Sequence, residues 1–276
     1  MTAEPPQQHL DEANAEFWAE LCGTHLARAV GVEDASAESL ARFDRAYMDV
    51  YPYLGRYLPW HSGERVLEIG LGYGTVGQLL AEHGLDYHGL DISPGPVGMM
   101  AHRLEMLGVG DAASRVTQGS ALAIPHPDES FDVVVSIGCL HHTGDLARSI
   151  GEVARVLRKG GQAMVMVYNS HSLRAALIRV GMLRTGVWRD PIRRAEFVRG
   201  LYDADVEGTA APATEFTSAA GVRRMFADFS EVRVRRENFD NIGVGAFGRQ
   251  LSIRRAVFLN NIARIAGTDL YVTATR

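Results

Sequence analysis

The stretch Val66-Leu67-Glu68-Ile69-Gly70-Leu71-Gly72-Tyr73-Gly74-Thr75 joins a short apolar run to three closely spaced glycines. Val76, Leu79 and Leu80 then recur at helical spacing, so this segment predicts a buried strand, a tight turn and a helix. Glycine lets backbone and ligand approach closely, and the free amide groups at the start of a helix favour electron-rich groups. We therefore expect a nucleotide-like ligand at this turn.

The glycine turn alone does not identify that ligand. The residues Gly72-Tyr73-Gly74-Thr75-Val76-Gly77 also fit the GxGxxG pattern of NAD-binding proteins. A second predicted strand, about 85–90, ends in Asp91, whose carboxylate would accept hydrogen bonds from ribose hydroxyls in either case. The motifs that follow along the chain have to decide whether the ligand is NAD or another nucleotide-like molecule.

Three further motifs follow in order. They are Gln118-Gly119-Ser120-Ala121, the predicted buried strand Phe131-Asp132-Val133-Val134-Val135-Ser136, and the turn Leu157-Arg158-Lys159-Gly160-Gly161 before another apolar run. With the glycine turn and Asp91, this succession resembles the class I S-adenosylmethionine (SAM) dependent methyltransferases over residues 63–168. The segment 270–275 is similar to the last strand of that family. The resemblance implies an α/β fold, a doubly wound Rossmann-like seven-stranded sheet with its last strand antiparallel, and SAM as the cofactor.

The resemblance also implies which residues hold SAM. The expected cofactor-binding residues are Glu68, Gly70, Gly72, Tyr73, Gly74, Asp91, Ile92, Ser120, Ala121 and Gly138. Of these, the glycine turn and Glu68 would line the methionine part, Asp91 the ribose, and Ile92 the adenine. Ser120 departs from the family, whose members usually carry an acidic residue there to accept from the adenine amino group. A hydroxyl accepts more weakly than a carboxylate.

The length and composition predict one α/β core with additional helices. A chain of 276 residues with 46% hydrophobic content exceeds what a minimal SAM-binding domain needs. We expect an N-terminal helical lid over 1–62, with helices near 16–30 and 36–49. The SAM-binding core would span 63–168, a helical substrate-selecting insertion 169–226, and the completion of the core sheet 227–276, including a helix over 250–265.

Charge and hydropathy exclude several classes of protein. The net charge of −5 argues against a globally basic nucleic-acid binder. No apolar run approaches the ~20 residues that span a bilayer, and residues 1–9 lack a signal-peptide core. We therefore expect a cytoplasmic protein with a small-molecule substrate and no nucleic-acid or membrane partner. The sequence leaves the oligomeric state open.

The two cysteines, Cys22 and Cys139, are far apart in the sequence and show no CxxC spacing. This spacing predicts neither a disulfide framework nor a zinc site. Both cysteines are expected to be reduced and buried.

Adjacent histidines are the candidates for catalysis. Methyl transfer needs a nucleophile held in line, and a base if that nucleophile carries a proton. His141 and His142 follow the predicted strand 131–136, and imidazole titrates near neutral pH. Either could be the base, or both could only line the pocket. Asp145 could orient an imidazole, although a helix cap is the interpretation we prefer, and a metal site built from these three residues is the least favoured.

Aromatic and polar side chains predict the acceptor site. Tyr47 and Tyr51 share a helix face, and Tyr168 and Asn169 follow the predicted fifth strand. These residues could wall and orient a partly apolar acceptor, while packing of a lid helix would also explain the tyrosines. The Asp/Asn-Pro-Pro-aromatic motif of many base-methylating enzymes is absent, since residues 136–139 read Ser-Ile-Gly-Cys.

Seven arginines between Arg174 and Arg199 stand against only Asp190 and Glu196. Such a strip could hold phosphates or an acidic carrier. We favour the alternative of a solvated helix face whose apolar residues pack inward. Those apolar residues are Leu177, Ile178, Leu183, Ile192 and Phe197.

Together these features predict a SAM-dependent methyltransferase of a small molecule. O-methylation is slightly ahead of N- or C-methylation because of the histidines, and a secondary metabolite would suit the aromatic residues. Two alternatives are a methyltransferase on RNA or a carrier-bound chain, held by the arginine strip, and a non-catalytic module that binds SAM or another nucleotide. An NAD enzyme remains a fourth hypothesis.

Overall fold

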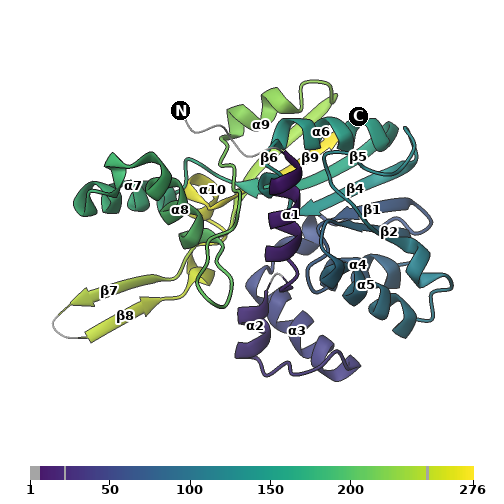
Figure 1. Ribbon diagram of the computed structural model, residues 1–276, viewed down its shortest axis with the longest axis horizontal. Coiled ribbons are helices and arrows are strands. Elements are labelled where there is room, and N and C mark those ends of the chain that lie inside the picture. The colour runs from purple at the N-terminus through teal and green to yellow at the C-terminus, as the bar shows by residue number, and fades with distance from the viewer. Residues whose placement is uncertain (1–6, 22, 247–248) are drawn as a thin grey trace.

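The computed structural model describes residues 7–21, 23–246 and 249–276, and within them the core is a seven-stranded sheet of order β3-β2-β1-β4-β5-β9-β6 (Figure 1). The strands are β1 Arg65–Ile69, β2 Asp86–Asp91, β3 Val116–Gln118, β4 Phe131–Ile137, β5 Leu157–Tyr168, β6 Glu231–Glu237 and β9 Asp269–Thr275. Strands β1 to β5 run parallel, and β9 is antiparallel to its neighbours β5 and β6. The predicted Rossmann-like sheet with an antiparallel last strand is confirmed.

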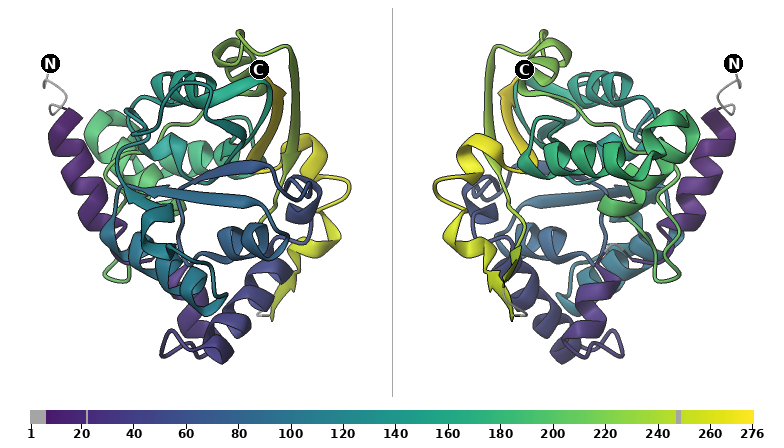
Figure 2. Two further views of the ribbon diagram at one scale, coloured as in Figure 1. Left: turned by 90° about the vertical axis from the view of Figure 1, so that its right-hand side faces the viewer. Right: turned by 90° about the vertical axis from the view of Figure 1, so that its left-hand side faces the viewer.

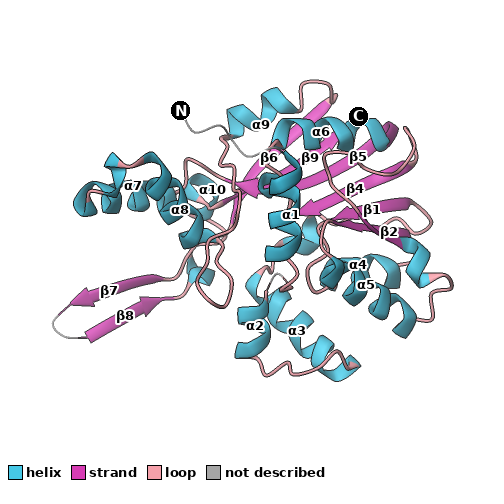
Figure 3. Ribbon diagram, in the orientation of Figure 1, coloured by secondary structure: helices cyan, strands magenta, loops and turns pink. Residues whose placement is uncertain are grey.

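Helices cover both faces of the sheet (Figure 3). On one face lie α4 Thr75–Glu82 and α5 Pro94–Met106, and on the other α6 Leu146–Val156 and α9 Ala219–Met225. Because a parallel strand in such a fold is buried from both sides, its sequence is a continuous apolar run. Val133, Val134 and Val135 on β4 are accordingly at most 3% exposed.

Of the three N-terminal helices, the first crosses the end of the sheet, and the other two lie below the sheet in the view of Figure 1, near α4 (Figures 1 and 2). They are α1 Gln7–Phe17, α2 Thr24–Ala29 and α3 Ala37–Val50. The predicted helix 36–49 matches α3, which begins after Ser36, whose side chain accepts from Ser39 N. The predicted helix 16–30 is wrong, because α1 ends at Phe17 and Gly23 adopts a left-handed φ of 99° before α2.

A buried ion pair fastens α3 to the core. The Arg103 guanidinium on α5 is fully buried and donates to both carboxylate oxygens of Asp44, at 2.8 and 2.9 Å. Asp44 also accepts from the Thr75 hydroxyl at the start of α4. Since a buried charge left alone is costly, the two partners hold α3 against α4 and α5.

The insertion after β5 contains α7 Leu173–Thr185 and α8 Pro191–Tyr202, which lie at the end of the molecule away from α4 and α5 (Figure 1). The predicted inward packing of its apolar side chains is wrong. Leu177 is 62% exposed, and Leu183 and Ile192 are each 65% exposed.

The predicted helix 250–265 is also wrong. The strand β8 Arg249–Ile253 pairs antiparallel with β7 Ile242–Ala246, and only α10 Ala263–Ala266 is α-helical in this segment. Pairing with a partner strand overrides a helical pattern read from one segment. Short 3-10 turns occur at Leu54–Arg56, Ala112–Arg115, Leu140–His142, Val187–Arg189 and Arg255–Val257. In the described part of the chain, no helix is both long and apolar enough to cross a membrane.

Candidate cofactor and active site

A cavity of about 1020 Å³, its open mouth included, lies at the carboxyl ends of β1, β2, β3 and β4. This edge is where open α/β sheets bind their ligands, because the chain reverses its direction of winding there. The helices α1 and α3 complete the wall with Asn14, Phe43 and Tyr47. The size is that of a site for a nucleotide-sized or drug-sized ligand.

Nine of the ten predicted cofactor-binding residues line this cavity. They are Glu68, Gly70, Gly72, Tyr73, Asp91, Ile92, Ser120, Ala121 and Gly138. Gly74 lies beside it as the left-handed N-cap of α4, with a φ of 78°. A Cβ on Gly74 would meet Arg103 Cδ at 2.7 Å, so this glycine serves the packing of α4 on α5.

Gly70 shows why the turn after β1 needs glycine. Its φ is 84°, and a Cβ there would lie 2.3 Å from the Cβ of Cys139. Real Cβ atoms do not approach so closely. The absence of a side chain therefore lets the ends of β1 and β4 come together and places Cys139 on the cavity wall. Cys139 is half-buried, and Cys22 lies outside the described residues.

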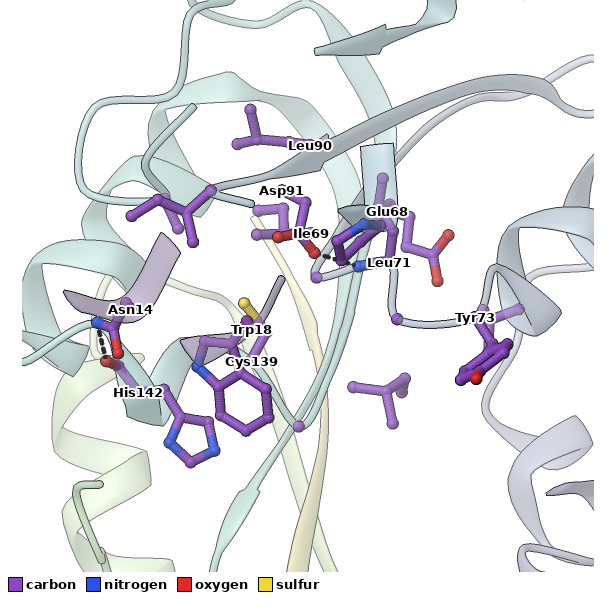
Figure 4. A pocket seen from close by; sticks show the side chains of 18 of the residues that line it. Asn14, Trp18, Glu68, Ile69, Leu71, Tyr73, Leu90, Asp91, Cys139 and His142 are labelled. Carbon is purple, nitrogen blue, oxygen red and sulfur yellow. Dashed lines mark hydrogen bonds between the residues drawn. The ribbon is translucent and has the colours of Figure 1, made fainter. Parts of the chain in front are cut away.

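Asp91 holds the glycine turn in shape. Its Oδ2 accepts from Leu71 N at 2.8 Å (Figure 4), and its Oδ1 accepts from Ser93 N at 2.9 Å. Burial raises the pKa of Asp91, and these backbone hydrogen bonds oppose the rise. Ile92 N is a third backbone donor to this carboxylate. A carboxylate offers about four lone-pair sites, so Asp91 keeps acceptor capacity to which the ribose hydroxyls of a ligand in the cavity would donate.

Glu68 is buried under α4. The Tyr87 hydroxyl donates to Glu68 Oε2 at 2.6 Å, and a Cβ on Gly77 would lie 2.6 Å from the same oxygen. Burial raises the pKa of Glu68 to about 8, although the Tyr87 hydrogen bond lowers it. The carboxyl group is therefore protonated over much of the physiological pH range when nothing cationic lies beside it.

This pKa predicts how stability depends on pH. The pKa of Glu68 rises from 4.5 to about 8 on folding. The protonated carboxyl group therefore contributes its full stabilisation of the folded state below pH 4.5, and this stabilisation is lost as the pH rises to about 8. We expect the free energy of unfolding of the ligand-free protein to fall by at most about 1.4 kcal/mol per pH unit in this window. In thermal unfolding, the stability of the Glu68→Gln variant should depend less steeply on pH than that of the wild type. Some pH dependence should remain because burial also raises the pKa of Asp269, to about 7.

The matched control is Glu105→Gln, which removes an exposed carboxylate from α5. Its stability curve should run parallel to that of the wild type. If Glu68→Gln also runs parallel to the wild type between pH 4.5 and 8, Glu68 is ionised in the folded protein at neutral pH and this account of it is wrong.

Three residues of the N-terminal segment, Asp11, Asn14 and Trp18, also line the cavity. Asn14 is 3% exposed, and its Nδ2 donates to the His142 carbonyl at 2.9 Å (Figure 4). In the described part of the chain no donor reaches Asn14 Oδ1. A hydroxyl or ammonium group of a ligand could satisfy this buried acceptor. The Trp18 ring contacts the His142 ring at a tilt of 55°, with ring centroids 4.8 Å apart.

The adjacent histidines are not equivalent. His142 lines the cavity, whereas His141 is fully buried between the rings of His142 and Tyr168, at centroid distances of 4.2 and 4.1 Å. Burial lowers the pKa of His141 well below its ordinary value. His141 does not reach the cavity, so the hypothesis that either histidine is the base narrows to His142.

His142 is held in one orientation by the loop before α9. Its Nδ1 lies 2.8 Å from the Ala213 carbonyl, and a carbonyl can only accept, so Nδ1 carries the proton and Nε2 has a free lone pair. Asp203 Oδ2 lies 3.7 Å from Nε2, and Asp203 Oδ1 accepts from the Tyr168 hydroxyl at 2.9 Å. Burial lowers the pKa of His142, and Asp203 partly offsets this.

The remaining predicted residues are distributed as follows. Tyr47 lines the cavity, while Tyr51 contacts Tyr47 at 4.9 Å from outside the lining. Tyr168 also lies outside the lining, with its hydroxyl on Asp203. Asn169 is fully buried and bonds the Gly267 carbonyl and His171 N, so it orders its own loop instead of facing the cavity.

Asp145 caps α6, as preferred from the sequence, because its side chain accepts from Arg148 N at 3.0 Å. Glu215 accepts from Leu146 N at the same helix end, and Glu215 N donates to the His141 carbonyl at 2.7 Å. The loop before α9 therefore supports the turn that carries both histidines.

Comparison with known proteins identifies the core. Residues 67–165 match the family model described as a methyltransferase domain. The chain is 36% identical over 102 residues to the phthiotriol/phenolphthiotriol dimycocerosates methyltransferase of Mycobacterium leprae, a match that covers 36% of each chain. It is 32% identical over 108 residues to the demethylmenaquinone methyltransferase of Tropheryma whipplei, covering 39% of this chain and 43% of that protein. These matches span less than half the length of either relative.

Solved structures show the same fold over a larger part of the chain. A SAM-dependent methyltransferase of Thermotoga maritima superposes with a TM-score of 0.53 at 18% identity, covering 83% of this chain and 88% of that one. The YcgJ protein of Bacillus subtilis gives a TM-score of 0.51 at 18% identity, covering 83% and 98%. At these identities the likeness concerns the fold alone.

Proposed function

From a chain whose core, residues 67–165, belongs to the class I SAM-dependent methyltransferases, we propose a protein that transfers the methyl group of SAM to a small-molecule acceptor. The observation that carries the proposal is the single cavity wall formed by the glycine turn, Asp91 and His142. It combines a site for a nucleoside with a base candidate. The sheet edge on which it lies is the one where this class of fold binds ligands.

The residues on the wall fit SAM. Asp91 keeps acceptor capacity for the ribose hydroxyls beyond its backbone hydrogen bonds, and Asn14 Oδ1 is a buried acceptor that the SAM ammonium group could satisfy. Ile92, Ser120 and Ala121 offer the apolar and hydroxyl surface proposed for adenine. SAM supplies a methyl group on a positively charged sulfur, which activates it for transfer to a nucleophile.

For the chemical step we propose His142 as the general base. Its Nε2 lone pair would take the proton of an acceptor hydroxyl as the oxygen forms its bond to the methyl carbon. Asp203 would stabilise the resulting imidazolium across 3.7 Å, and the Ala213 carbonyl would keep the ring oriented. Asp203 is thus a positioning residue that acts through His142. This arrangement favours O-methylation.

The names of the relatives do not indicate which acceptor atom this protein methylates. Their names specify an O-position in 27-O-demethylrifamycin SV methyltransferase, carbon in sterol 24-C-methyltransferase and nitrogen in phosphoethanolamine N-methyltransferase. O-methylation therefore rests on His142. The rings of Trp18, Phe43 and Tyr47 on the cavity wall support a partly apolar acceptor, and we propose a secondary metabolite.

Calorimetry with SAM, S-adenosylhomocysteine and NAD tests the cofactor assignment on which the proposal depends. We expect SAM and S-adenosylhomocysteine to bind at micromolar concentrations, NAD not to bind, and Gly72→Arg to abolish binding, because an arginine side chain would fill the cavity beside the turn. NAD binding without SAM binding would overturn the cofactor assignment. SAM binding without turnover of any hydroxyl, amine or alkene acceptor would favour a non-catalytic module instead.

A further inference from the structure

The insertion carries an exposed apolar stripe along α7. Leu173, Leu177, Val180 and Leu183 recur at helical spacing, so they lie on one side of the helix. Their exposed fractions are 37%, 62%, 48% and 65%. Neither apolar cluster of the described core includes any of them. An amphipathic helix normally turns such a stripe towards the core, so this one faces an environment outside the chain.

Exposed aromatic and apolar side chains continue this surface beyond α7. Trp188, in the turn between α7 and α8, is 46% exposed, and Ile192 on α8 is 65% exposed. The Arg189 guanidinium lies over the Trp188 ring, 5.5 Å from its centroid. We call the exposed side chains of α7, this turn and α8 the insertion face.

The insertion face is also strongly basic. Its exposed arginines are Arg179, Arg184, Arg189, Arg193 and Arg194. Across α7 and α8 there are seven arginines and two acidic residues, a surplus of five positive charges in a chain whose net charge is −5. The rest of the chain is therefore acidic. This separation of charge would turn the insertion face towards a negatively charged surface.

The other two arginines hold the insertion together. Arg174 donates to the Leu201 carbonyl, pairs with Asp240 at 3.2 Å and lies 4.4 Å from the Tyr202 ring centroid. Arg199 is half-buried. Arg174 thus ties α7 to α8 on this inner side, so the stripe and the five exposed arginines belong to one packed unit.

We propose that the insertion face binds the surface of an anionic lipid bilayer. Leucine, valine, isoleucine and tryptophan beside arginine is the composition of helices that lie in the membrane interface. Tryptophan prefers the headgroup level, and arginine can keep its charge at the headgroups while its stem covers apolar surface. The proposal is independent of the methyl-transfer reaction, and it departs from the expectation that the protein has no membrane partner.

Two other occupants fit this face less well. A second copy in a two-fold dimer would bring the five exposed arginines of each chain against those of the other, which costs free energy. Nucleic acid would satisfy the arginines but would leave the leucine stripe in water, since base recognition uses aromatic stacking and hydrogen bonds. A bilayer surface satisfies both the apolar and the charged groups.

Vesicle sedimentation tests the proposal with the full chain. We expect the protein to sediment with equimolar phosphatidylcholine and phosphatidylglycerol vesicles, to bind vesicles of phosphatidylcholine alone weakly, and to be released by salt. The Arg189→Gln/Arg194→Gln variant should lower the partition coefficient by about twenty-fivefold, at about fivefold for each arginine. Leu177→Asp/Leu183→Asp should lower it by at least about tenfold.

Matched controls separate the insertion face from general charge and hydrophobicity. The charge control, Arg223→Gln/Arg233→Gln, removes two arginines from α9 and β6. The hydrophobicity control, Met106→Asp/Leu107→Asp, replaces two apolar side chains at the end of α5 that are 40% and 37% exposed. Both controls should bind mixed vesicles within about twofold of the wild type. Circular dichroism and thermal unfolding check that each variant folds.

Several results would overturn the proposal. One is the absence of binding to the mixed vesicles, and another is equal loss of binding in the insertion-face variants and their controls. A dimer in sedimentation velocity that Leu177→Asp/Leu183→Asp dissociates would assign the face to a second copy. Tighter, arginine-dependent binding to single-stranded RNA would assign it to nucleic acid.

Discussion

We expect Asp91→Ala to lose about 10²–10⁴-fold in affinity for SAM, because hydrogen bonds to a charged group contribute about 1.5–3 kcal/mol each and two ribose hydroxyls would lose their acceptor. The substitution also leaves Leu71 N and Ser93 N without the carboxylate that now accepts from them. The turn after β1 should loosen as a result. Calorimetric titration with SAM and S-adenosylhomocysteine measures the loss.

Asp86→Ala is the matched control, because Asp86 begins the same strand at the end away from the cavity. Its carboxylate pairs with Arg115 and with Arg65 on the surface. SAM affinity should stay within about twofold of the wild type, since exposed pairs contribute little. If Asp91→Ala binds SAM as well as Asp86→Ala does, the nucleoside does not rest on the end of β2.

The second large effect concerns turnover. His142→Ala should lower kcat on a hydroxyl acceptor by about 10²–10⁴-fold, the usual contribution of a general base. SAM affinity should change much less, because the proposed ribose and adenine contacts lie on other residues. His141→Ala is the companion variant: it removes a buried ring outside the cavity and should lower thermal stability more than kcat. Equal, small effects of the two variants on kcat would reduce His142 to a lining residue.

The pH profile of kcat separates the base from its surroundings. A base acts in its neutral form, and burial lowers the pKa of His142, an effect that Asp203 and the Ala213 carbonyl oppose. The His141 ring, whose pKa burial also lowers, contacts the His142 ring at a tilt of 46°. We therefore expect kcat to be flat above pH 6.5, the ordinary value for histidine, and to fall only in more acid solution.

Asp203→Asn extends this test to the positioning residue. Without the carboxylate, the imidazolium of His142 loses its partner at 3.7 Å, so the acid limb should move to lower pH. Plateau kcat should fall because the base is weaker. A role of Asp203 limited to packing would lower kcat or stability but would leave the position of the acid limb unchanged.

The sequence by itself, through motifs that resemble those of the class I SAM-dependent methyltransferases, predicted the sheet and most of the proposed cofactor wall. These features depend on local chemistry: a glycine turn between a strand and a helix, an aspartate at the end of the next strand, and apolar runs for strands buried on both faces. Since the carboxyl ends of parallel strands meet at one edge, motifs in the right order along the chain also meet in space. Nine of the ten predicted cofactor residues accordingly line one cavity.

Only the tertiary structure could decide which distant residues join that wall. Asn14 and Trp18 reach it because α1 packs against the turn that carries His141 and His142. Asp203, at the end of α8 in the insertion, lies beside the His142 ring. Periodicity likewise could not show that residues 249–253 pair with 242–246, or that the α7 stripe faces outward. Local patterns fix which side of an element is apolar, whereas long-range packing decides what that side meets.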